Sequence, residues 1–75
     1  MIPKDKTYHL IVGFIITLAV GLFFGNVAAG LLAGVVAGVA KEVKDYLDYG
    51  KFDGFDMFAT WIGSFLGSAV VVIVL

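Results

Sequence analysis

The chain contains no cysteine and little charge. The absence of cysteine excludes disulfides, thiolate metal sites, cysteine nucleophiles and lipidation on cysteine. Charged residues make up only 15% of the 75 residues. The lysines form no run long enough to follow a phosphate backbone, so we expect no nucleic-acid partner.

Hydrophobic residues account for 61% of the chain, against roughly 45–50% in typical soluble domains. A soluble chain of this size would bury only about 60% of the surface that its unfolded form exposes. It could not hide so many Leu, Ile, Val and Phe side chains from water. The composition therefore predicts an integral membrane protein, with membrane lipids as its surroundings.

Three apolar segments divide the chain. The first is uncharged from Leu10 to Phe24, the second from Val27 to Ala40, and the third from Phe58 to Leu75. Asn26 suits the N-cap of the second segment, and Gly50 suits its end. A strand would leave backbone groups unpaired in lipid, so each segment is expected to be helical. We predict an all-α fold, a single transmembrane domain over residues 1–75, with three transmembrane helices at about 7–24, 27–49 and 55–75.

Small residues recur at helical spacing in every segment. Because lipid removes the hydrophobic drive between helices, close approach at small residues must hold such helices together. The pattern predicts a glycine-packed bundle in which three stripes meet: Gly13, Thr17, Gly21 and Gly25; Gly30, Gly34 and Gly38; and Ala59, Gly63 and Gly67.

All lysines fall before the first segment or around the second connection, whereas the Gly25–Asn26 connection carries none. By the positive-inside rule, the lysine-bearing face is cytoplasmic. We expect a bacterial inner-membrane protein with a cytoplasmic N-terminus and an outer C-terminus. The lysines are Lys4, Lys6, Lys41, Lys44 and Lys51, and the aromatic residues expected at the same face are Tyr8, Tyr46, Tyr49 and Trp61.

Each glycine stripe leads to ionisable residues at this face, which the helical period points toward the other helices. These residues would place four carboxylates and one imidazole in a partly dehydrated site. The carboxylates would repel one another unless the site binds a cation or holds protons. Oxygen-rich donors with one nitrogen suit Mg²⁺, Mn²⁺ or Zn²⁺. The predicted metal ligands are Asp5, His9, Glu42, Asp45 and Asp56. The alternative is that these are interfacial charges, paired with lysines, that set the depth of the helices.

Three short motifs carry a resemblance to a known group of proteins. They are Asp5-Lys6-x-x-His9, Lys41-Glu42-x-x-Asp45 and Asp56-x-x-Ala59-x-x-x-Gly63. In this order they resemble small bacterial and phage membrane proteins of the VanZ-like and YfiM-type families. The resemblance implies that the motif residues form a shared polar site, and it implies no particular reaction.

Two classes of function fit these residues. The first is a divalent-metal-dependent hydrolase or transferase acting on a lipid head-group phosphate or ester. In it Glu42 and Asp45, with Asp56, hold the cation, His9 shuttles a proton and Lys41 offsets developing negative charge. The alternative is an oligomeric cation or proton channel lined by Thr60, Ser64 and Ser68, or a structural partner of another membrane protein. The channel requires a homo-oligomer, because three short helices cannot enclose a pore.

Overall fold

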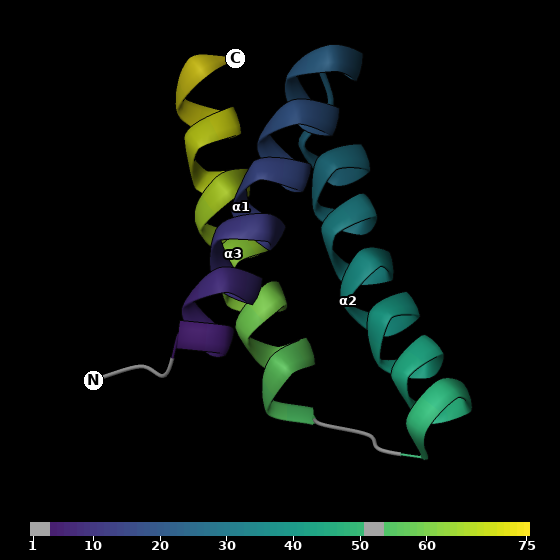
Figure 1. Ribbon diagram of the computed structural model, residues 1–75. Coiled ribbons are helices and arrows are strands. Elements are labelled where there is room, and N and C mark those ends of the chain that lie inside the picture. The colour runs from purple at the N-terminus through teal and green to yellow at the C-terminus, as the bar shows by residue number, and fades with distance from the viewer. Residues whose placement is uncertain (1–3, 51–53) are drawn as a thin grey trace.

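The computed structural model describes the backbone of residues 4–50 and 54–75 and the side chains of residues 7–50 and 54–75. The described residues form three α-helices: α1 (Lys4–Phe24), α2 (Val27–Tyr49) and α3 (Gly54–Val74) (Figure 1). The predicted all-helical fold with three helices is therefore confirmed. The helices lie close to the predicted ranges.

Local chemistry sets the ends of α2. Gly25 adopts a φ of +62°, a left-handed conformation that glycine accepts without strain. The Asn26 side chain then accepts a hydrogen bond of 3.2 Å from the Ala29 backbone N–H and caps the helix. At the other end Gly50 is left-handed, with a φ of +69°, and its N–H donates to the Tyr46 carbonyl. The connection between α1 and α2 is thus a tight hairpin.

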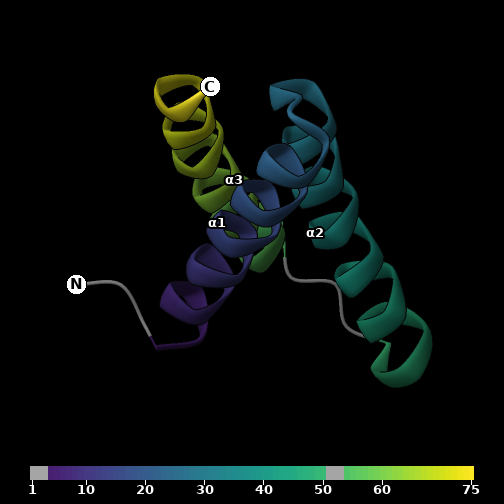
Figure 2. The same ribbon diagram turned by 90° about the horizontal axis from the view of Figure 1, so that it is seen from above.

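The three helices lie side by side, with α2 running in the direction opposite to α1 and α3 (Figures 1 and 2). The start of α1, the end of α2 and the start of α3 lie at one end of the bundle, which we call the polar end. The α1–α2 connection and the end of α3 lie at the other. α1 and α3 cross each other closely, and α2 diverges from them toward its C-terminal end (Figure 1).

The crossing of α1 and α3 depends on two glycines. A Cβ atom on Gly63 would lie closer than 3.0 Å to the carbonyl carbon and oxygen of Leu10, and one on Gly13 would collide in the same way with the Thr60 carbonyl. Each helix therefore sets a glycine against the backbone of the other. Such contact is available only to residues without a side chain.

α2 joins this pair through its own glycines. A Cβ on Gly30 would strike the backbone of Gly21, and one on Gly34 would strike the Ser64 and Thr17 hydroxyl oxygens. The predicted stripes thus face the interior. Gly25 is the exception, because it is exposed and nothing lies within 4 Å of a Cβ built there. Its role belongs to the turn and not to helix packing.

The distribution of side chains is the reverse of that in a soluble protein. Among the described residues, only Ala59 and Val71 are buried hydrophobic residues, while buried polar side chains include Thr17 and Ser64. Large apolar residues such as Phe65 point outward. The interior is made of small and hydroxyl-bearing residues, and the surface is apolar.

Within the described residues, two helices are long and apolar enough to cross a membrane. They are α1, over Thr7–Phe24, and α3, over Gly54–Val74. α2 is as long, but its second half contains Lys41, Glu42 and Lys44. Length and composition therefore identify two of the three predicted spans.

Candidate functional site

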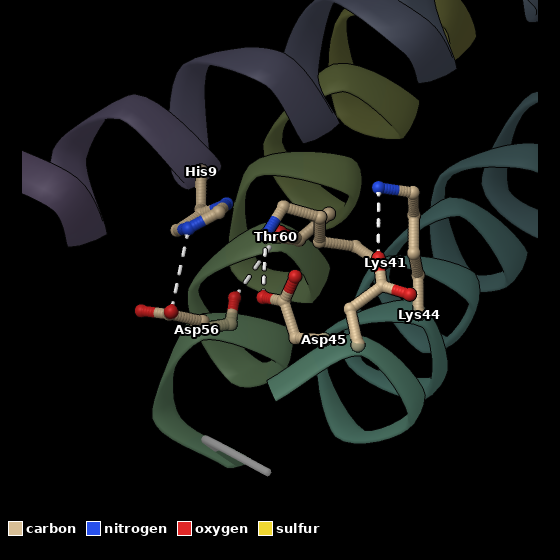
Figure 3. A network of polar contacts seen from close by, with 7 residues as sticks. His9, Lys41, Lys44, Asp45, Asp56 and Thr60 are labelled. Atoms are coloured by element: carbon tan, nitrogen blue, oxygen red, sulfur yellow. Dashed lines mark hydrogen bonds and ion pairs between the residues drawn. The ribbon is translucent and has the colours of Figure 1, made fainter. Parts of the chain in front are cut away.

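An imidazole and a carboxylate meet at the polar end of the bundle. His9 Nε2 of α1 lies 3.4 Å from Asp56 Oδ2 of α3, and the two side chains are only 14% and 16% exposed (Figure 3). A carboxylate beside one ring nitrogen fixes the orientation and tautomer of histidine. The pair therefore has the arrangement of a general base with its orienting acid.

The same residues are tied to the helix packing. His9 lies one turn before Gly13, and Asp56 accepts through its backbone carbonyl a 3.1 Å hydrogen bond from the Thr60 hydroxyl. Thr60 in turn provides the carbonyl against which Gly13 packs. The glycine contact between α1 and α3 therefore brings the two members of the pair together.

Glu42 contributes a carboxylate from α2. It is 1% exposed and is among the largest fully buried side chains of the described residues. Its burial follows from its place one turn beyond Gly38, on the face of α2 that packs against the other helices. Burying a carboxylate costs free energy unless hydrogen bonds or charges compensate it. The burial of Glu42 therefore indicates a candidate functional site at the polar end.

A lysine lies next to these acids. Lys41 Nζ forms an ion pair with Asp45 Oδ2 one turn away on α2, and Glu42 and Asp56 also attract its charge. The Lys41 side chain is half exposed, whereas the Asp45 side chain is more enclosed. Lys41 therefore lies at the surface of the bundle, in contact with Asp45. His9, Lys41, Glu42, Asp45 and Asp56 are named the polar cluster.

A second ion pair lies farther along α2. Lys44 and Asp48 are 3.3 Å apart and largely exposed, with Lys44 at 72%. Asp48 was not among the predicted site residues, although its four-residue spacing from Lys44 on a helix indicates such a pair.

Four of the five predicted metal ligands have described side chains. Among the residues whose side chains are described, no three His, Asp or Glu groups are placed to hold one metal ion. The side chain of Asp5, the fifth predicted ligand, lies outside the described residues. The structure brings His9 and Asp56 together and pairs Asp45 with a lysine, so we derive no catalytic step through a metal.

The hydroxyl groups of α3 are occupied by backbone carbonyls. Ser64 donates to the Thr60 carbonyl at 3.0 Å and lies 3.4 Å from the Gly13 carbonyl. Ser68 donates to the Phe65 carbonyl at 2.7 Å. These side chains are buried in the bundle, and the bond from Ser64 to the Gly13 carbonyl joins α3 to α1. This geometry does not favour a polar track lining a pore.

Trp61 has a role that sequence reasoning missed. Its indole N–H donates a 3.2 Å hydrogen bond to the Val35 carbonyl of α2. The expectation of an interfacial aromatic belt fits the exposed Tyr8, Tyr46 and Tyr49 better than it fits this tryptophan. The signal available in the sequence was the position of Trp61 beside the small-residue face of α3.

Comparisons with protein-family models, with curated proteins and with solved structures found no match. The resemblance to the VanZ-like and YfiM-type families stays a prediction.

Proposed function

We propose that this chain is an integral membrane protein in which all three helices cross the bilayer and the polar end is cytoplasmic. The inverted distribution of side chains supports this, because an apolar surface over a small-residue interior suits lipid. The hairpin supports the crossing by α2. If α1 spans the membrane, a connection this short returns α2 alongside it.

The polar cluster is proposed to be an acid–base site that hydrolyses a phosphate or ester bond near the lipid head group. His9 takes a proton from water, and the resulting hydroxide attacks the phosphorus or the carbonyl carbon. The leaving alkoxide then receives that proton from His9. Asp56 orients the ring, and Lys41 offsets the negative charge that develops on the attacked group.

The single observation that carries this proposal is the His9–Asp56 pair. A histidine that served only to anchor the helix would be expected to face water or lipid head groups freely. Here its ring faces a carboxylate of another helix, and both side chains are mostly buried. A general base with an orienting carboxylate is what water-dependent bond cleavage requires, and the close packing of α1 against α3 positions this pair.

The test uses the full chain reconstituted in vesicles of phosphatidylglycerol and phosphatidic acid. Release of inorganic phosphate, glycerol phosphate and fatty acid is measured over time. We expect release of one of these products by the wild type and a loss of about 100-fold or more in His9→Asn, in keeping with the usual size of general-base catalysis.

The matched control is Lys44→Ala, which removes an exposed charge outside the polar cluster and is expected to retain the wild-type rate. Circular dichroism and gel filtration establish that each variant is folded. Equal rates for the wild type and a folded His9→Asn would refute the role of His9. The absence of every product from the wild type would refute the hydrolase proposal on these lipids.

A further inference from the structure

The surface that faces outward is not equally apolar on the three helices. On α1 and α3 the ionisable residues His9 and Asp56 face each other and are mostly buried, so the outer surface is uncharged over Thr7–Phe24 and nearly so over Gly54–Val74 (Figure 3). On α2 the half-exposed Lys41 ends the uncharged stretch that begins at Val27.

The uncharged stretches of the three helices therefore differ in length. At 1.5 Å per residue, the apolar segments of α1 and α3 are about 27 and 31 Å long, close to the roughly 30 Å hydrocarbon thickness of a bilayer. The stretch from Val27 to Ala40 is about 21 Å long. Snorkelling by Lys41 recovers only part of the difference. One side of the bundle is therefore too short for an average bilayer.

The outer face of α2 is suited to lipid and not to a second copy of the chain. Its exposed residues include the branched Leu32, Val36 and Val39. Its small residues Gly30 and Gly34 are already in contact with the other two helices. Helix association in lipid relies on such small residues. The exposed alanines of this stretch, Ala28 and Ala40, lie at its two ends, so its exposed middle presents branched side chains to lipid.

We propose that α2 is a thin-bilayer flank, a surface that fits lipids with short acyl chains and draws their head groups down to the level of Lys41. Mismatch of this kind is relieved by local thinning of the bilayer. Head groups lowered beside α2 would come level with the polar cluster. This inference rests on the proposed membrane-spanning arrangement and names the side from which a lipid reaches the site.

The experiment measures thermal unfolding of the full chain in phosphatidylcholine vesicles whose two monounsaturated chains range from roughly 14 to 22 carbons, a series that varies hydrocarbon thickness. The wild type should have its highest Tm in the shortest-chain vesicles. In Lys41→Leu/Asp45→Leu, the first exposed charge becomes Lys44, one turn later, so the optimum should move to longer chains.

The matched control is Lys44→Leu/Asp48→Leu, which also removes one lysine–aspartate pair from α2 but leaves Lys41 in place. Its optimum should stay with that of the wild type. A wild-type optimum at 18 carbons or longer, or equal shifts in the two double variants, would overturn the inference.

Extraction of the same vesicles with alkali distinguishes failure of the thin-bilayer flank from failure of the proposed membrane-spanning arrangement. A chain that alkali removes does not span the membrane, and the proposed arrangement itself fails. A chain that stays in the vesicles without a short-chain optimum contradicts only the thin-bilayer flank. The lipid-hydrolysis assay is independent of both readouts.

Discussion

The closest contact between helices predicts the effect of adding a single methyl group. In Gly63→Ala, the new Cβ would overlap the carbonyl of Leu10, which belongs to the backbone of α1 and cannot rotate away. In Gly38→Ala, the atoms nearest to the new Cβ would belong to side chains, with Trp61 Nε1 at 3.2 Å and Thr60 Cβ at 3.3 Å. The same substitution is thus tested against a rigid and a yielding neighbour.

The difference can be worked from these contacts. Relieving the overlap at Gly63 requires α1 and α3 to separate by roughly 1 Å, which forfeits a quarter to a half of each dispersion contact along the crossing. Overpacking of this kind costs about 1–3 kcal/mol, and a backbone obstacle belongs at the upper end of that range. Alanine regains up to about 1 kcal/mol of helix propensity at both sites. We expect Gly63→Ala to lose about 2 kcal/mol and Gly38→Ala to change stability by less than about 1 kcal/mol.

The assay is equilibrium unfolding by sodium dodecyl sulfate in lipid-containing micelles, followed by helical circular dichroism and by Trp61 fluorescence. Wild type and both variants are compared at the same protein-to-lipid ratio. The reasoning is refuted if Gly63→Ala is as stable as the wild type, or if Gly38→Ala loses as much as Gly63→Ala. Either result would mean that the α1–α3 crossing does not depend on the absence of a side chain at Gly63.

Three further predictions concern topology, cation binding and the link between α2 and α3. In intact cells, a membrane-impermeant maleimide should label Asn26→Cys and not Lys44→Cys; the opposite pattern would invert the proposed orientation. If the predicted divalent-cation site exists, Mg²⁺, Mn²⁺ or Zn²⁺ should raise the Tm of the wild type by mass action and leave that of Glu42→Gln unchanged; identical responses would exclude Glu42 as a ligand. Trp61→Phe should lower the free energy of unfolding by about 1 kcal/mol, because it removes the hydrogen bond to the Val35 carbonyl and keeps an aromatic ring; unchanged stability in the detergent titration would show that this bond adds nothing.

The ends of the helices and the faces that they bury could be predicted from short-range chemistry. Asn26 and Gly50 act on backbone groups within four residues, so their effects do not depend on the rest of the fold. The inward direction of Glu42 follows from the helical period that also buries Gly38. For the same reason His9 and Asp56 were expected to face other helices, as they do.

The partners of the polar residues could not be predicted in this way. Lys41 was expected near a carboxylate, and the helical spacing alone allowed Asp45 or a residue of another helix; the structure pairs it with Asp45. The helical period also predicts that Asp45 lies on the same face of α2 as Glu42. It does not predict which acidic side chains lie close enough to bind one ion. That choice depends on the separation and crossing of the helices.

By itself the sequence determined three helices, their glycine faces and the gathering of charge at one end, because each depends on residue type and on spacing along one helix. Only the tertiary structure decided that Gly63 meets the Leu10 carbonyl, that His9 meets Asp56, and that Trp61 reaches across to α2. These contacts join residues about 26 to 53 positions apart, and a shift of one helix by a single turn would preserve every glycine stripe while changing each of them. The steric fit of glycine against a neighbouring backbone selects one of these arrangements, and that selection assembles the polar cluster.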